Sequence, residues 1–352
     1  MSHNILITGG SGYLGGSLLA GLKGANLPPY STLYALVRTD DQAKAVRQYA
    51  AEPLQINLSS PESITSTIIN KQITIVFHLY DAIDIDNPST FIKALSQVKQ
   101  ATGQEVHFLY TTGAKLFSEF AGAPTDKPLL DTDAELYAIQ KKQVDTAPIP
   151  FMSQGVQANN LVIEEAEKNG VRAYIFAPCI VYGKGTGFGN KISIQTVGIV
   201  RIAKAVRKVY DLNEGKPTWP VCHIDDNTSL YVEILRAALQ DRDIGHGKQG
   251  YYLASSGSVA WADIYEAMGK TLKERGAVDV EGVHVGPSVE EMGKMGEALG
   301  SPPELVRWAT GGACTLTAEN GAKIGWKAKY PKEHVLEFAD AEVDWILTNL
   351  GK

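Results

Sequence analysis

A glycine-rich segment close to the N-terminus constrains the fold of this 352-residue chain more than any other feature. Residues 5–15 read ILITGGSGYLG, so that Gly9, Gly12 and Gly15 follow an apolar run and precede a helical pattern. Glycine permits backbone conformations that a side chain would block, and it lets another group approach the chain closely. The helix that follows would direct free N–H groups and a positive dipole end towards the turn. This arrangement is typical of a site for the pyrophosphate of a dinucleotide, and the alternative is a tight structural turn.

The first half of the chain repeats this alternation of strand and helix. Short apolar runs predict strands at residues 4–8, 32–37, 73–79, 105–111 and 171–177. Helical patterns lie between them, at residues 16–22, 90–100 and 153–168. Runs that are apolar on both faces suit a parallel sheet covered by helices. The sequence therefore predicts an α/β fold with a doubly wound parallel sheet of the Rossmann type.

The character of the chain changes after about residue 183. Residues 184–190 read KGTGFGN and predict a loop, and the pattern beyond them is more helical, with strand-like pieces at 221–224 and 251–254. We expect a dinucleotide-binding domain at residues 1–185. Residues 186–352 would form mainly a smaller substrate-binding lobe, with some segments returning to the first domain.

Composition excludes several classes of partner. The net charge of −6 argues against a protein that grips a nucleic-acid backbone. The three cysteines are odd in number and far apart, without zinc-ligand spacing, which fits a reducing compartment and predicts no metal site. The N-terminus lacks the basic and apolar regions of a signal peptide, and no apolar run is long enough to span a bilayer. We expect a cytoplasmic protein without a membrane partner.

The end of the second predicted strand bears on the choice of cofactor. A carboxylate there would bind the ribose 2′-OH of NAD, but Arg38 occupies the place, and its planar fork can pair with a 2′-phosphate. Asp40 and Asp41 follow, and we place them beyond the strand in a loop. The sequence favours NADP, with NAD as the second possibility. A solvated surface arginine is the alternative reading of Arg38.

Several further motifs occur in order along the chain. Residues 8–16 read TGGSGYLGG, Asn57-Leu58 follows, and IVFHL, YTT, APCIVYG, HIDD and IGW begin at residues 75, 110, 177, 223 and 324. Together they resemble the extended, atypical short-chain dehydrogenase/reductase family, whose members include NAD-dependent epimerases and dehydratases as well as carbonyl reductases. The resemblance covers most of the chain. It implies cofactor contacts from these residues: Gly9, Gly12, Tyr13, Leu14, Gly15, Asn57, Leu58, His78, Leu79, Pro178 and Cys179.

The same resemblance implies a catalytic hydroxyl from Thr112, but the proton-transfer pair of the family is missing. The family uses Tyr-x-x-x-Lys on a helix, where lysine lowers the pKa of the tyrosine. Counting back from residue 177 places Val156 and Asn160 at those positions, and neither can transfer a proton. Tyr80 stands where the family has a small residue near the nicotinamide. We therefore expect Thr112, Tyr80 and Asn160 to be the catalytic residues, with Tyr80 or a water supplying the proton and Asn160 positioning substrate or water.

Tyr137 and Lys141 form a second Tyr-x-x-x-Lys and remain an alternative. The segment 145–150, DTAPIP, would end their helix soon after the lysine, because proline is costly in a helix interior. We predict that Tyr137 and Lys141 lie on a different helix from Val156 and Asn160, outside hydrogen-bond reach of the nicotinamide.

Two functions follow from these residues. The first is an NADP-dependent oxidoreductase or epimerase-like enzyme acting on a small organic carbonyl or hydroxyl substrate. The second is a dinucleotide-fold protein without redox turnover, acting as a cyclase, isomerase or dehydratase, or as an NADP-binding sensor. The resemblance also implies a homodimer that pairs the helices predicted from residues 90 and 153.

Overall fold

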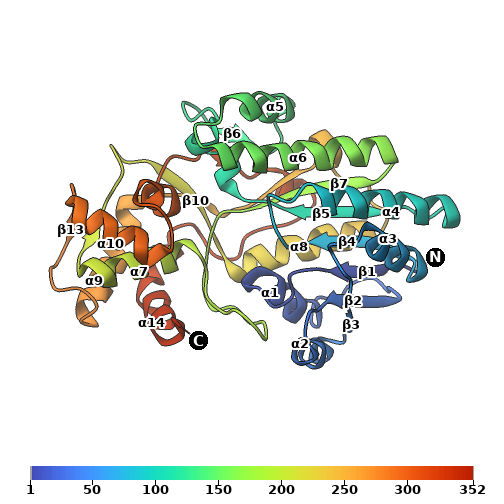
Figure 1. The fold of residues 1–352 in the computed structure, drawn as a ribbon, viewed down its shortest axis with the longest axis horizontal. Coiled ribbons are helices and arrows are strands. Elements are labelled where there is room, and N and C mark those ends of the chain that lie inside the picture. Colours follow the sequence, from blue (N-terminus) through green and yellow to red (C-terminus); the bar gives the residue numbers. More distant parts are fainter. Residues whose placement is uncertain (1, 352) are drawn as a thin grey trace.

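A seven-stranded parallel sheet forms the centre of the computed structural model, which describes residues 2–351 (Figure 1). The strands lie in the order β11-β7-β5-β4-β1-β2-β3. β1 lies at the reversal of strand order, since it pairs with β2 on one side and with β4 on the other. The sheet comprises β1 (Asn4–Ile7), β2 (Thr32–Leu36), β3 (Glu52–Leu54), β4 (Ile73–His78), β5 (His107–Thr111), β7 (Arg172–Pro178) and β11 (Tyr251–Ala254). This arrangement confirms the predicted doubly wound α/β fold.

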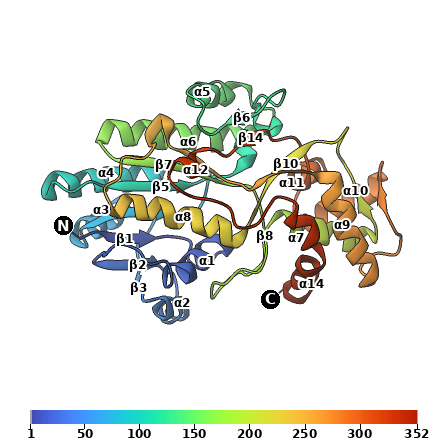
Figure 2. The same cartoon turned by 180° about the vertical axis from the view of Figure 1, so that it is seen from behind.

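Helices cover both faces of the sheet. The front face in Figure 1 carries α3 (Pro61–Asn70), α4 (Asp86–Thr102) and α6 (Pro150–Asn169), which pack side by side. The opposite view shows α8 (Ile224–Leu239), which packs against α1 (Tyr13–Leu22) (Figure 2). All six residues of β4 are buried, as expected of a strand covered on both sides. Smaller elements at this sheet are α2 (Asp40–Val46), α5 (Leu136–Thr146), β6 (Leu129–Leu130), β14 (Leu316–Thr317) and α12 (Asn320–Lys323).

Several predicted boundaries were wrong. The helix predicted from residue 153 begins at Pro150, because proline fits the first turn of a helix, where its missing N–H is not needed. The helix predicted from residue 90 begins at Asp86, and the strand predicted from residue 105 begins at His107. Asp40 and Asp41 are not in a loop but form the first turn of α2, where their negative charges suit the helix dipole.

A second group of elements packs at one end of the sheet (Figure 1). Its small sheet has the order β12-β10-β8, and β13 pairs with β9. Both α8 and β11 belong to the later half of the chain but lie with the large sheet. The group comprises β8 (Ile180–Tyr182), α7 (Gln195–Val206), β9 (Val209–Tyr210), β10 (Thr218–His223), β12 (Gly257–Ala260), α9 (Trp261–Glu274), β13 (Val283–His284), α10 (Val289–Leu299), α11 (Val306–Thr310), α13 (His334–Glu337) and α14 (Ala339–Asn349).

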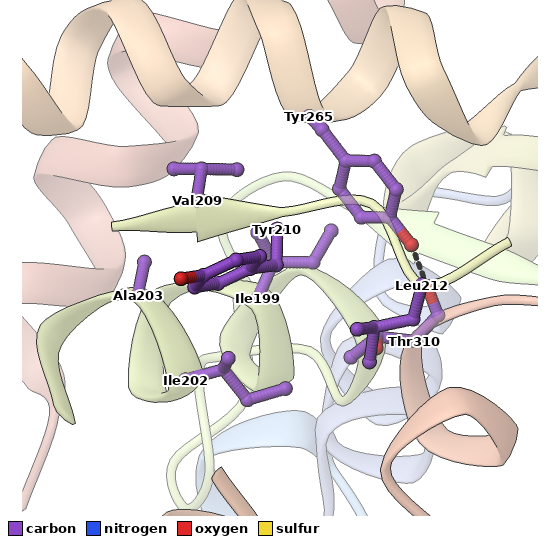
Figure 3. A pocket seen from close by; sticks show the side chains of 8 residues that line it. All are labelled: Ile199, Ile202, Ala203, Val209, Tyr210, Leu212, Tyr265 and Thr310. Carbon is purple, nitrogen blue, oxygen red and sulfur yellow. Dashed lines mark hydrogen bonds between the residues drawn. The ribbon is translucent and has the colours of Figure 1, made fainter. Parts of the chain in front are cut away.

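The interior of this second group is closely packed. Apolar side chains of α7 and β9 meet Tyr265, whose hydroxyl donates a hydrogen bond to the carbonyl of Thr310 (Figure 3). The space that they leave is about 10 Å³, which is room for one water molecule at most. We therefore regard this cavity as part of the core and not as a ligand site.

Two findings concern membrane spans and cysteines. Between residues 2 and 351, no helix is both long and apolar enough to cross a membrane. The three cysteines are buried and unpaired.

Candidate active site

The glycine-rich turn between β1 and α1 is a bare cradle of backbone. Gly9 has a φ of +68°, and a Cβ added there would collide with the carbonyl of Leu79. A Cβ on Gly15 would collide with the carbonyl of Gly9. Gly12 precedes α1 and offers no side chain to cap it, so the first N–H groups of the helix remain available. These features fit the pyrophosphate of a dinucleotide.

A large cavity extends from this turn past the carboxyl ends of β4, β5 and β7. Its volume is about 550 Å³, and it lies beside the point where the strand order reverses, the usual place for a ligand in an open α/β sheet. Nine of the residues expected at the site line it: Gly9, Gly12, Tyr13, Leu14, Gly15, Leu79, Thr112, Pro178 and Cys179.

Thr112 and Cys179 differ in what they offer this cavity. The Thr112 hydroxyl is buried and, within residues 2–351, has no hydrogen-bond partner. The Cys179 thiol donates to the carbonyl of Ala254 at 3.0 Å. Burial also raises the pKa of this thiol, which keeps it protonated. Cys179 is therefore a wall of the cavity and not a nucleophile.

The residues expected beside the adenosine half lie outside the cavity, at the neighbouring strands. Arg38 follows β2 and is exposed, and its guanidinium makes no hydrogen bond or ion pair with any other part of the chain that the structure describes. Asn57 follows β3 and accepts a hydrogen bond from the Ser59 N–H at 3.1 Å, while Leu58 is half-buried. Arg38 is thus available to an external anion.

His78 does not line the cavity, contrary to the expectation that it contacts the cofactor. It is the last residue of β4 and lies among the rings of Phe91, Phe108 and Tyr110. Burial lowers the pKa of His78 to about 4, so the ring is neutral. Successive side chains along an extended chain point to opposite sides. Leu79 therefore reaches the cavity, whereas its neighbour His78 does not.

Tyr80 also lies outside the lining, so the catalytic role expected for it is not supported. Its side chain is 44% exposed. The chain turns sharply at the next residue, Asp81, which has a φ of +51° and accepts hydrogen bonds from the N–H groups of Ile83 and Asp84. This turn carries Ile83 to the cavity in place of Tyr80.

Asn160 is a third expected residue that the cavity excludes. It is buried in α6, and its amide donates to the carbonyl of Gln140 at 3.3 Å. The cavity meets the same helix earlier, at Phe151, Met152 and Gly155. Because each residue advances the helix by about 1.5 Å, Asn160 lies beyond the end of the cavity.

The second Tyr-x-x-x-Lys lies on α5, separate from α6. The Tyr137 hydroxyl donates to Glu164 at 2.6 Å, and the Lys141 ammonium pairs with the same carboxylate oxygen at 2.7 Å. Neither Tyr137 nor Lys141 lines the cavity. The pair therefore joins two helices on the outer surface.

Lys115 is a cation in the lining of this cavity that was not among the residues predicted from the sequence. It follows β5 on the same segment as Thr112 and is partly buried. Its ammonium donates to the carbonyl of Trp308 and lies 4.8 Å from the ring centre of Trp219, 5.0 Å from that of Trp308 and 5.6 Å from that of Phe120. No carboxylate between residues 2 and 351 forms an ion pair with it. Burial lowers the pKa of Lys115 to about 7. The available signal was a lysine three residues after the expected catalytic hydroxyl.

The C-terminal helix supports one wall of the cavity. Glu342 of α14 accepts hydrogen bonds from the Gly183 N–H at 2.9 Å and from the Thr196 hydroxyl at 2.7 Å. Thr196 in turn bonds to Ser193, which lines the cavity. Burial raises the pKa of Glu342 to about 7.

The loop that begins at Gly183 lies on the glycine-rich turn. The Tyr13 hydroxyl donates to the carbonyl of Gly183 at 2.7 Å, and the Asn190 N–H donates to the carbonyl of Ser11 at 2.9 Å. Among residues 2–351 there is no cluster of three or more His, Cys, Asp or Glu side chains that could hold a metal ion.

A parallel sheet with a glycine cradle and an adjoining cavity defines a dinucleotide-binding enzyme of the Rossmann type. The model of the NAD dependent epimerase/dehydratase family matches residues 5–247, and the chain belongs to that family. It is accordingly a dinucleotide-dependent enzyme of the oxidoreductase or epimerase type.

Comparisons with individual proteins agree with this assignment. The chain is 22% identical over 305 residues to "Oxidase ucsJ" from Acremonium sp, covering 80% of this chain and 83% of the relative. Solved structures share the fold at low identity. Vestitone reductase from alfalfa matches with a TM-score of 0.56 at 17% identity, over 99% of each chain. UDP-glucose 4-epimerase from Thermotoga maritima, with UDP-glucose, matches with a TM-score of 0.58 at 16% identity, also over 99% of each chain.

Proposed function

We propose that the protein is an NADP-dependent oxidoreductase in which Lys115 and Thr112 act on the oxygen of a carbonyl or hydroxyl substrate. One observation carries the proposal. Lys115 lines the cavity that begins at the glycine-rich turn, on the same segment as Thr112, whose hydroxyl has no partner within residues 2–351. These two side chains would replace the missing Tyr-x-x-x-Lys.

The chain's own groups suit the binding of NADP. The glycine cradle and the first N–H groups of α1 would bind the pyrophosphate, and the unpaired Arg38 guanidinium would bind the 2′-phosphate. The bound dinucleotide would supply or accept a hydride at its nicotinamide ring.

Proton transfer falls to Lys115. During reduction, the Thr112 hydroxyl donates a hydrogen bond to the carbonyl oxygen, and the Lys115 ammonium gives that oxygen its proton while hydride reaches the carbon. In the reverse direction the neutral amine accepts the proton. A pKa of about 7 provides both forms near neutral pH, as a general acid and base requires. The names of the oxidase and of the reductase among the similar proteins also favour redox turnover.

The test follows NADPH absorbance with a panel of aldehydes and ketones. Loss of a general acid typically costs 10²- to 10⁴-fold in rate, so Lys115→Met should lower turnover by about this factor while NADPH still binds. Thr112→Val should also impair turnover. Lys141→Met, which removes a surface lysine of α5, is the matched control and should leave the rate unchanged. Tight NADPH binding without turnover by the native enzyme would favour the alternative of a non-redox cyclase, isomerase, dehydratase or sensor.

Three further expectations belong to this proposal. We divide the chain into a dinucleotide-binding domain at residues 1–185 and a substrate-binding lobe at 186–352, with α8 and β11 returning to the first. The buried, unpaired cysteines support a cytoplasmic location. We also propose a homodimer through the outward faces of α4 and α6, and a monomeric mass in light scattering at micromolar concentration would contradict it.

A further inference from the structure

The walls of the cavity around Lys115 are apolar. Aromatic and aliphatic side chains come from the start of α6, from the segment after β5 and from two tryptophans of the second half of the chain. They are Leu116, Phe151, Met152, Trp219 and Trp308. The rings of Phe151 and Trp308 meet edge to face at 5.2 Å, and the Trp308 N–H points to the Met152 sulfur at 3.3 Å. These contacts fix the shape of the wall.

Charged groups are scarce on the same walls. Among the described residues that line the cavity there is no arginine, aspartate or glutamate, and Lys115 is the one lysine. A phosphate or carboxylate buried here would lack the forked cation that proteins usually place against such groups. Leaving an anion unpaired in apolar surroundings costs several kcal/mol.

Two residues of the lining carry hydrogen-bonding groups without a partner. Thr112 and Trp219 line the cavity, and the Thr112 hydroxyl and the Trp219 indole N–H are buried and have no partner within residues 2–351. Buried polar groups in proteins nearly always have partners, so these two indicate a ligand atom. Lys115 is the third polar residue of this part of the lining; the other polar side chains, Tyr13, Asn190, Ser193 and Gln195, come from the glycine-rich turn and from the segment that leads into α7.

The outer end of the cavity exposes apolar side chains. Ile194, just before α7, is 78% exposed, and Ile83, after β4, is 45% exposed, yet both line the cavity. Tyr80 and Ile85, on either side of Ile83, are also large exposed hydrophobic residues. A ligand with an apolar body in the cavity would cover Ile83 and Ile194 and remove their surface from water.

We infer that the substrate is an uncharged, predominantly hydrocarbon carbonyl or alcohol. Its oxygen lies at Lys115, Thr112 and Trp219, and its apolar body extends past Trp308 to Ile83 and Ile194. A nucleotide sugar, whose diphosphate would meet no cation but Lys115 on these walls, does not fit. The inference rests on the proposed function for the position of the oxygen, but the apolar body follows from the walls alone.

The experiment measures binding without chemistry. Protein saturated with NADP⁺ has no hydride to give a ketone, so 2-decanone would form a dead-end complex, and tryptophan fluorescence would report it from Trp219 and Trp308. UDP is the anionic probe. We expect 2-decanone to bind and UDP not to bind at this site. Ile194→Asp should weaken 2-decanone binding about tenfold or more, because an apolar contact is lost and a charge is added.

Val289→Asp is the matched control, since Val289 is 91% exposed on α10 and lies outside the cavity lining. It should leave binding unchanged. Binding of UDP that Ile194→Asp weakens, which would place the anion in this cavity, or failure of 2-decanone to bind, would overturn the inference. NADPH oxidation with a nucleotide sugar would refute the inferred substrate class, but it would agree with the proposed oxidoreductase function. The opposite result is 2-decanone binding that Ile194→Asp weakens, without turnover of any carbonyl compound. It would support an apolar ligand but refute the proposed oxidoreductase function.

Discussion

Replacing Lys115 by methionine tests whether the cavity holds an amine that has lost part of its hydration. Burial lowers the pKa of Lys115 from the ordinary 10.5 to about 7. Between those two values the unfolded chain retains the lysine proton while the folded chain has released it. The free energy of unfolding of the native protein therefore rises with pH across this window, by up to about 1.4 kcal/mol per pH unit.

The full window corresponds to at most about 5 kcal/mol. Because Lys115 lines a cavity that water can enter, and because a carbonyl and three rings stabilise its ammonium, we expect about 2–5 kcal/mol. The Lys115→Met variant has no proton to lose at this position. Subtracting its unfolding free energy from that of the native protein therefore leaves the contribution of Lys115, without that of the other titrating groups. This difference should grow as pH rises from about 7 towards 10, and the variant should be the more stable protein below pH 7.

Urea unfolding followed by circular dichroism, at several pH values on both sides of 7, measures the difference for both proteins. Parallel curves for the native protein and Lys115→Met would refute the reasoning, because they would show that the amine titrates alike in the folded and unfolded chains. The same lysine should make kcat/KM for carbonyl reduction fall as pH rises through about 7, since the proton donor is then lost.

Three other variants test separate parts of the site. Arg38→Ala should weaken NADPH binding about tenfold, as for loss of a charged hydrogen bond, and leave NADH binding unchanged in calorimetry; an unchanged preference would defeat the assignment of NADP. Gly9→Ala should abolish dinucleotide binding, because its Cβ would meet the Leu79 carbonyl, whereas Gly24→Ala, with open space around it, should bind normally. The raised pKa of Glu342 means that the folded chain holds the carboxyl proton more tightly than the unfolded chain does. The protonated carboxyl therefore stabilises the fold by at most about 3 kcal/mol, and this contribution is lost as pH rises from about 4.5 to about 7. Glu342→Gln should flatten this part of the thermal-stability profile, and an unaltered slope would exclude Glu342 as its source.

The pattern of hydrophobic residues was sufficient to predict every strand of the sheet except β3. Strands covered on both faces, such as β4, read as continuous apolar runs, and the glycine-rich turn marked the first helix. The short strand β3 and the helices α2 and α3 were missed. Only one residue of β3 is buried, so its hydrophobic signal is weak.

The inner part of the site was harder to predict, because it depends on where side chains point. Strand alternation separates His78 from Leu79, and the left-handed residue Asp81 turns Tyr80 away from the cavity. The sequence does not reveal that Lys115 lines a cavity, because lysines are usually on the surface. Only the tertiary fold brings Trp219 and Trp308, about a hundred residues or more away in sequence, around its ammonium.

The bonds of Glu342 also have a consequence for synthesis. The ribosome releases the glycine-rich turn long before α14, and domains generally fold as they emerge. The loop that begins at Gly183 and the cavity wall at Ser193 are joined to each other through the carboxylate of Glu342, which follows Gly183 by 159 residues. A nascent chain can thus complete its large sheet while this wall still lacks its anchor. We therefore expect chains stalled or cleaved before α14 to have an unanchored substrate wall, so that NADP binding outlasts activity in them.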